Sequence, residues 1–182
     1  HMQRHILVGL TSAFAAFFTY VAIQPAAFTV TRSTTIAAPP AAVFPHINEL
    51  KRWDAWSPWA KKDPTAKIAY SGPAAGVGST FAWSGNKEIG EGEMRIVESR
   101  PVDRIALKLA FTKPFAGNND VAFDLKPAGE GTQVTWSLAG NHGFVERAFL
   151  LMMGIKMDAM IGGEYEKGLA ALKQVVETAP KG

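Results

Sequence analysis

The chain has 182 residues, of which 19 are Lys or Arg and 16 are Asp or Glu, giving a formal net charge of +3 at pH 7. The basic residues are scattered, which argues against a nucleic-acid-binding protein, because such proteins present a basic stripe. Cysteine is absent, which excludes disulfides, thiolate metal sites and a Cys nucleophile.

An uncharged apolar run extends from Ile6 to Ile23. As a helix it spans roughly 27 Å at 1.5 Å per residue, close to the thickness of a bilayer core. The run therefore predicts an uncleaved membrane anchor. Two alternatives stay open: a cleaved signal, for which Ala13-Phe14-Ala15 resembles a cleavage site, and a buried core helix. The predicted division is an anchor or signal over 1–27 and one ligand-binding domain over 28–182.

Short segments with period-2 alternation and β-branched residues predict strands. The predicted strands, separated by Gly, Pro and Asn, are 28–36, 67–71, 79–83, 88–98, 104–111, 119–126 and 133–139. Pro39-Pro40 predicts a helix start, with Pro45 limiting that helix. A second short helix is expected over 49–56.

The apolar period changes to that of a helix after Gly143. One long helix is predicted, with a stripe that packs on the apolar face of the strands. The stripe comprises Leu151, Ile155, Asp158, Gly162, Tyr165, Leu169, Leu172 and Val176. The predicted fold class is thus α+β, with a curved antiparallel sheet of about seven strands wrapped on a long C-terminal helix, and two short helices after the first strand.

A series of motifs runs along the domain in a distinctive order. They are Arg32-Ser33, Ile36, Ala38-Pro39-Pro40, Val43-Phe44, Trp53, Trp56-Ser57-Pro58-Trp59, Tyr70-Ser71-Gly72-Pro73, Gly76-Val77-Gly78, Trp83-Ser84-Gly85-Asn86, Gly90-Glu91-Gly92-Glu93-Met94, Glu98-Ser99-Arg100-Pro101, Gly131-Thr132, Val134-Thr135-Trp136, Met157-Asp158, Ile161-Gly162, Glu166 and Gly168-Leu169. With these motifs the chain resembles the SRPBCC or START-like superfamily. Within it, the chain is similar to the membrane-anchored bacterial polyketide cyclase/dehydrase and lipid-transport group.

This resemblance implies a helix-grip fold, in which the sheet and the long helix enclose a hydrophobic cavity. The expected ligand is a hydrophobic small molecule or lipid, with no cofactor. The candidate ligand-binding residues are Trp83, Met94, Leu107, Leu109, Phe123, Trp136, Ile155, Asp158, Gly162 and Leu169. Arg4 and His5 before the apolar run favour a single-pass inner-membrane protein with its domain on the periplasmic or extracellular side.

Two carboxylates are candidates for a catalytic role. Asp158 interrupts the apolar stripe, where a buried charge needs a partner. It either lines the cavity opposite space left by Gly162, or bonds an arginine or a loop and pins the helix. Glu91 lies between Gly90 and Gly92, which either leave cavity space or mark a bulge that turns Glu91 inward. The alternative is that Glu91 and Glu93 lie on a solvated face of the strand.

Three functions follow from these observations. The first is a carrier that binds a hydrophobic ligand beside the membrane. The second is a cyclase or dehydratase in which a raised pKa lets Asp158 or Glu91 act as a base. The third is an envelope protein with a filled core and a protein partner. No metal site is expected, because His46 and His142 have no partner at ligand spacing. The sequence leaves the oligomeric state open.

Overall fold

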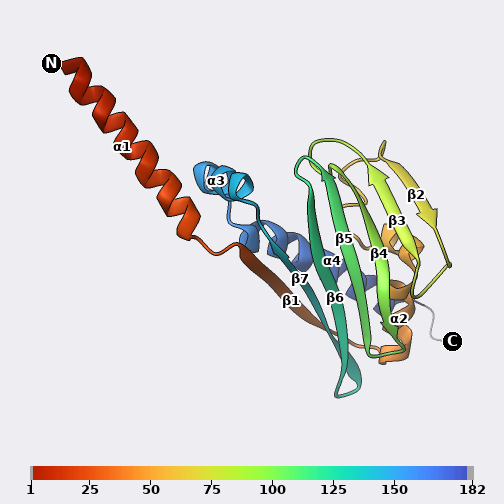
Figure 1. The fold of residues 1–182 in the computed structure, drawn as a ribbon. Coiled ribbons are helices and arrows are strands. Elements are labelled where there is room, and N and C mark those ends of the chain that lie inside the picture. Colours follow the sequence, from red (N-terminus) through yellow and green to blue (C-terminus); the bar gives the residue numbers. More distant parts are fainter. Residues whose placement is uncertain (1, 180–182) are drawn as a thin grey trace.

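The computed structural model describes the backbone of residues 2–179 and the side chains of residues 11–179. Helix α1 (Met2–Ile23) projects away from a curved sheet that makes up most of the molecule (Figure 1). Among the residues with described side chains, no helix is long and apolar enough to cross a membrane. Residues 6–10 of the predicted apolar run lie outside that described part.

The sheet has seven antiparallel strands in the order β1-β7-β6-β5-β4-β3-β2. This arrangement and the helix packed on it confirm the predicted sheet and C-terminal helix of a helix-grip fold. The strands are β1 (Ala27–Ile36), β2 (Lys67–Ser71), β3 (Thr80–Ser84), β4 (Glu91–Arg100), β5 (Arg104–Lys113), β6 (Gly117–Ala128) and β7 (Gly131–Asn141). The bounds of each strand agree with the predicted bounds within a few residues, because Gly and Pro mark the turns where the alternation stops.

Two short helical segments follow β1, as predicted: α2 (Pro40–Asn48) and the 3₁₀ helix η1 (Leu50–Ala55). The expectation that Pro45 limits the first helix is wrong, since α2 continues through it. Proline removes only one N–H from this helix. Val43 and Ile47 are fully buried and hold both sides of the proline against the core.

The predicted single long helix is instead two helices, α3 (Phe144–Met153) and α4 (Met157–Thr178). Gly154 separates them with a left-handed φ of 65°, a conformation that glycine adopts at helix C-termini. Its N–H donates to the carbonyls of Leu150 and Leu151. The stripe is therefore interrupted: Leu151 is exposed on α3, and Ile155 lies in the connection.

Helix α4 lies across one face of the sheet and makes its most extensive helix–strand contacts with β1 (Figure 1). Its buried residues are Gly162, Tyr165, Gly168, Leu169, Leu172 and Val176. Side chains alternate between the two faces of a strand, so the residues facing α4 define a concave face. The core lies between this face, α4, α2 and η1.

Candidate functional site

The concave face extends beyond the part that α4 and η1 cover. Directly paired residues on adjacent strands share a face, and the pairs Ile68–Trp83, Phe81–Met94 and Met94–Leu109 continue the apolar core toward the β2 edge. Most of these side chains are half-buried, and Ile68 is 45% exposed. We call this region the concave apolar surface. It consists of Ile68, Phe81, Trp83, Met94, Leu109 and Phe111.

The aromatic rings give this surface a defined shape. Trp83 stacks on Phe81 with ring centroids 5.7 Å apart and meets Phe111 edge-on at 5.6 Å. A Cβ at Gly92 would lie 2.7 Å from the Trp83 ring. The space that Gly92 leaves is therefore occupied by Trp83. The pairing register also shifts between Glu91 and Gly92, so the structure has a bulge there as well as a close approach.

The part of the concave face under α4 is filled by aromatic side chains. Trp136 lies between Phe123, at a centroid distance of 4.8 Å, and Tyr165, at 3.7 Å. Trp53 and Trp56 of the η1 region contact both Phe123 and Trp136. These side chains are at most 7% exposed. This half of the concave face is a packed core.

A cluster of charges joins α4 to the edge strand β1. Asp158, Gly162 and Glu166 are four residues apart along one side of α4. The Arg32 guanidinium lies across Gly162 and donates to both carboxylates: Nη2 to Asp158 Oδ2 at 3.0 Å and Nε to Glu166 Oε1 at 2.7 Å. A Cβ at Gly162 would overlap Arg32 Nη2. Arg32 thus occupies the space that the sequence assigned to a ligand, and we call this group the Arg32 cluster.

The Arg32 cluster has the geometry of a structural clamp. The Asp158 side chain is 66% exposed at the edge of the domain. The hydrogen bond from Arg32 lowers the pKa of Asp158 below its ordinary value, and the charge of Arg32 acts in the same direction. A general base at neutral pH requires the opposite shift. Of the two roles predicted for Asp158, the geometry corresponds to pairing with an arginine.

We expect the free energy of unfolding of Asp158→Asn to fall less than that of wild type as the pH is lowered below about 4. Because the folded pKa of Asp158 lies below its ordinary value of 3.8, its contribution is present above about pH 4 and is lost as pH falls through the folded pKa. Urea unfolding of wild type and variant between pH 7 and pH 2.5 measures this. Glu130→Gln, in the exposed β6–β7 turn, is the matched charge control. Parallel wild-type and Asp158→Asn profiles would contradict the clamp.

Glu91, the other candidate base, is also paired. Lys113 Nζ donates to Glu91 Oε1 at 3.0 Å, and the Ser84 hydroxyl donates to the same oxygen at 3.1 Å. The hydrogen bond from Lys113 is the main cause of a lowered pKa for Glu91, although partial desolvation opposes it. The raised pKa that the cyclase hypothesis requires is therefore seen at neither carboxylate. The described residues also contain no cluster of ligands suited to a metal ion.

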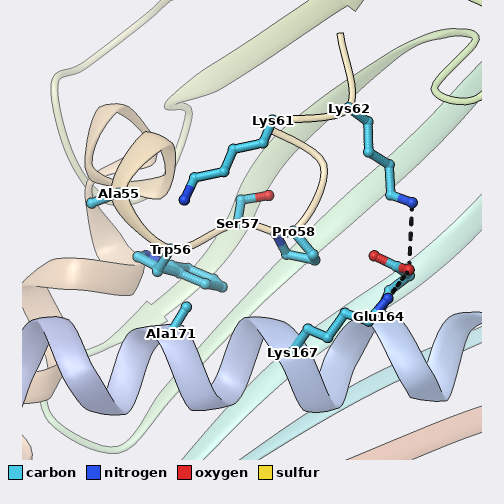
Figure 2. Close-up of a pocket in the computed structure, with 9 residues that line it drawn as sticks. All are labelled: Ala55, Trp56, Ser57, Pro58, Lys61, Lys62, Glu164, Lys167 and Ala171. Atoms are coloured by element: carbon cyan, nitrogen blue, oxygen red, sulfur yellow. Dashed lines mark hydrogen bonds and ion pairs between the residues drawn. The ribbon is translucent and has the colours of Figure 1, made fainter. Parts of the chain in front are cut away.

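A groove of about 320 Å³ lies between α4 and the segment that follows η1 (Figure 2). Trp56, Pro58 and Ala171 give it an apolar floor, and Lys61, Lys62 and Lys167 lie around it. Burial disfavours ionisation of Glu164, the one acid in the lining. Hydrogen bonds and charge from Lys167 and Lys62 nevertheless leave its pKa below the ordinary value. The groove is therefore net positive, and none of the predicted ligand-binding residues lines it.

The segment of residues 57–66 ties α4 to the β3–β4 connection. Lys62 Nζ pairs with Glu164 on α4 at 3.4 Å. Next to it, Asp63 Oδ2 accepts the backbone N–H of Asn86 at 2.7 Å. Trp59 packs edge-on against Tyr165 at 6.0 Å. This segment thus bounds the concave side of the domain.

The predicted ligand-binding residues are distributed over four places. Trp83, Met94 and Leu109 belong to the concave apolar surface, and Asp158 and Gly162 to the Arg32 cluster. Ile155 lies in the α3–α4 connection. The remaining four are in the packed core: Leu107, Phe123, Trp136 and Leu169. Sequence reasoning did not include Phe81 and Phe111 as site residues, although alternation places them two residues from Trp83 and Leu109.

Comparisons with known proteins agree on the fold. The sequence model described as "Polyketide cyclase / dehydrase and lipid transport" matches residues 27–177. No curated protein matches the chain. Protein CV1439 of Chromobacterium violaceum is similar in structure, with a TM-score of 0.60 and 16% identity over 84% of this chain and 98% of that one. MLL2253 of Mesorhizobium loti gives 0.60 and 15% over 85% and 100%. Aha1 of Colwellia psychrerythraea, solved as a dimer, gives 0.58 and 18% over 85% and 99%.

Proposed function

Because the chain belongs to the polyketide cyclase/dehydrase and lipid transport family, we propose that it binds a hydrophobic small molecule or lipid on the concave apolar surface. The apolar run from Ile6 to Ile23 holds the domain at a bacterial inner membrane, on its periplasmic or extracellular side. The chain acts as a binder or carrier rather than as a catalyst.

The observation that carries this proposal is the half-buried state of the concave apolar surface. The apolar face of an antiparallel sheet is usually covered by other elements of the domain. Here Phe81 and Met94 pack against the core, Trp83 stacks on Phe81, and all three stay in contact with solvent. An apolar ligand on this surface removes its own area and that of the rings from water, which contributes about 25 cal/mol per Å² before ordering costs.

A polar contact for the ligand lies at one end of this surface. Asn119 is paired directly with Leu109, so it shares the concave face. Its side-chain oxygen lies over Gly140, where a Cβ would overlap it. The Asn119 amide offers both a donor and an acceptor. We propose that it orients a head group while the rings hold the apolar part.

The binding hypothesis is favoured over the cyclase hypothesis by the state of the two candidate bases. Both Asp158 and Glu91 are paired with cations and have lowered pKa values. A weakly basic carboxylate is a poor acceptor for a proton from carbon at neutral pH. Ligand binding on an apolar surface needs no such group.

We expect Met94→Glu to weaken binding of cis-parinaric acid, a fluorescent fatty acid, by at least about tenfold, since a charge on this surface must be desolvated. Val97→Glu is the matched control: Val97 is 43% exposed on the same strand and lies outside the surface. Fluorescence titration of the full chain gives both affinities, and circular dichroism verifies folding. Equal affinities for the two variants would mean that the ligand does not bind on the concave apolar surface. Absence of binding by wild type, with no lipid co-purified in native mass spectrometry, would refute the proposed function.

A further inference from the structure

Helix α3 exposes its apolar side chains and turns its charged ones inward. The exposed fractions are 72% for Val145, 71% for Met152 and 59% for Met153, and no residue of α3 is buried. The two charged residues contact the domain instead: Arg147 Nη1 donates to the Gln24 carbonyl, and Glu146 pairs with His142. A helix on a water-exposed surface shows the reverse arrangement.

The apolar surface of α3 continues onto a neighbouring turn. Phe115, between β5 and β6, is 39% exposed and contacts Phe149 with ring centroids 5.7 Å apart. We call the combined region the α3 patch. It consists of Phe115, Phe144, Val145, Phe149, Leu151, Met152 and Met153, all exposed. Contiguous exposed apolar side chains of this kind mark a membrane or protein contact.

The position of α3 beside α1 indicates which surroundings cover the α3 patch. The Phe18 and Phe144 rings stack with centroids 6.1 Å apart. Phe18 lies about 7.5 Å from the last residue of α1 at 1.5 Å per residue. The start of α3 is therefore level with the final turns of α1 and not beyond them. Phe18 belongs to the apolar run, so whatever surrounds the end of that run also surrounds Phe144.

Arg147 fixes this arrangement. It donates to the carbonyl of Gln24, immediately after α1, and its guanidinium lies 5.9 Å from the Phe144 ring. A cation at a helix C-terminus is favoured by the helix dipole. Val21, in the last turn of α1, is fully buried. Helices α1 and α3 are thus held together at one end of the domain (Figure 1).

We propose that the α3 patch is a second membrane-contact surface, seated in the interfacial region of the bilayer beside α1. This inference rests on the proposed anchoring by α1. An amphipathic helix of this kind lies in the membrane plane with its apolar side chains among the acyl chains. The contact fixes the tilt of the domain, which a single anchoring helix leaves free.

The absence of cysteine allows a direct test with single labels. The full chain is reconstituted in phosphatidylcholine vesicles containing nitroxide-labelled lipid. It carries a fluorophore at Val145→Cys, Met152→Cys, Ala16→Cys or Glu130→Cys. Ala16 reports on α1, and Glu130 is exposed in the β6–β7 turn, at the end of the sheet away from α1. We expect loss of fluorescence at positions 145, 152 and 16, and none at 130.

The four positions separate the two proposals. Loss at position 16 without loss at 145 and 152 would overturn the α3 inference and leave the anchor standing. No loss at any of the three would overturn both. Loss at 145 and 152 alone would refute the anchor and, with it, the inferred place of the α3 patch beside a membrane-embedded α1. The fluorophores at 145 and 152 can also be shielded from water without losing fluorescence to the nitroxide lipid. That result would assign the patch to a contact with a second copy of the chain and overturn the membrane contact.

Discussion

Replacing Trp136 with alanine is expected to lower the free energy of unfolding by about 3–5 kcal/mol, the usual range for a buried tryptophan. Trp136 is 2% exposed and contacts the rings of Phe123, Tyr165, Trp53 and Trp56. Its Nε1–H is buried without an acceptor among the described residues, and removing it relieves about 1–3 kcal/mol. The loss is therefore expected near the lower end of that range.

Trp83→Ala is the matched control for this substitution. Trp83 lies on the same concave face but is only half-buried, so less area returns to water and the cavity opens to solvent. Urea denaturation followed by circular dichroism measures both variants. We expect the larger loss for Trp136→Ala and the larger effect on ligand affinity for Trp83→Ala. Equal losses of stability would mean that the division of the face into a packed core and an accessible surface is incorrect.

Gly168→Ala is expected to destabilise the fold by about 1–2 kcal/mol, even though alanine favours helix by up to about 1 kcal/mol. A Cβ at Gly168 would lie 2.8 Å from the Trp136 ring and 3.0 Å from Pro58 Cδ. Both neighbours are rigid, and Trp136 is itself enclosed. The added methyl group must therefore shift α4 away from the sheet.

Gly163→Ala, on the same helix, is the matched control, because among the described residues no atom lies within 4 Å of its Cβ position apart from its chain neighbours and the adjacent backbone of α4. There we expect only the gain in helix propensity, up to about 1 kcal/mol. The two variants differ only in what the methyl group meets, and their urea midpoints should move in opposite directions. A gain of stability in both would show that α4 does not pack tightly on Trp136.

Local patterns predicted most of the fold. Alternation in segments such as 104–111 predicted strands, and paired Gly and Pro marked their ends. The same patterns predicted the order of the elements, and the family resemblance added the helix-grip arrangement of the sheet around the long helix. The break at Gly154 was missed because spacings of three and four residues continue across it. Periodicity reports which residues share a face, whereas a left-handed residue ends the helix without changing the spacing.

The Arg32 cluster could not be predicted from local sequence patterns, because its members are far apart in the chain. Asp158 and Gly162 looked like features of a cavity because each interrupts an apolar stripe. Their partner, Arg32, is 126 residues away from Asp158 in the chain, and only the pairing of β1 with β7 brings it under α4. Likewise, Gly92 suggested an empty space, but the ring that fills it comes from Trp83 on the next strand.

The connection between α1 and β1 limits how far the domain can move from the end of α1. Helix α1 ends at Ile23, and β1 begins at Ala27 and pairs with β7 from its first residue. The three residues between them extend about 10 Å at most. Under the anchoring that we propose for α1, so short a connection keeps the domain next to its own membrane and does not let it cross to a second one. We therefore expect the proposed carrier to exchange its ligand with the adjacent leaflet or with a partner that comes to it, and the rate of exchange to depend on how often such partners arrive.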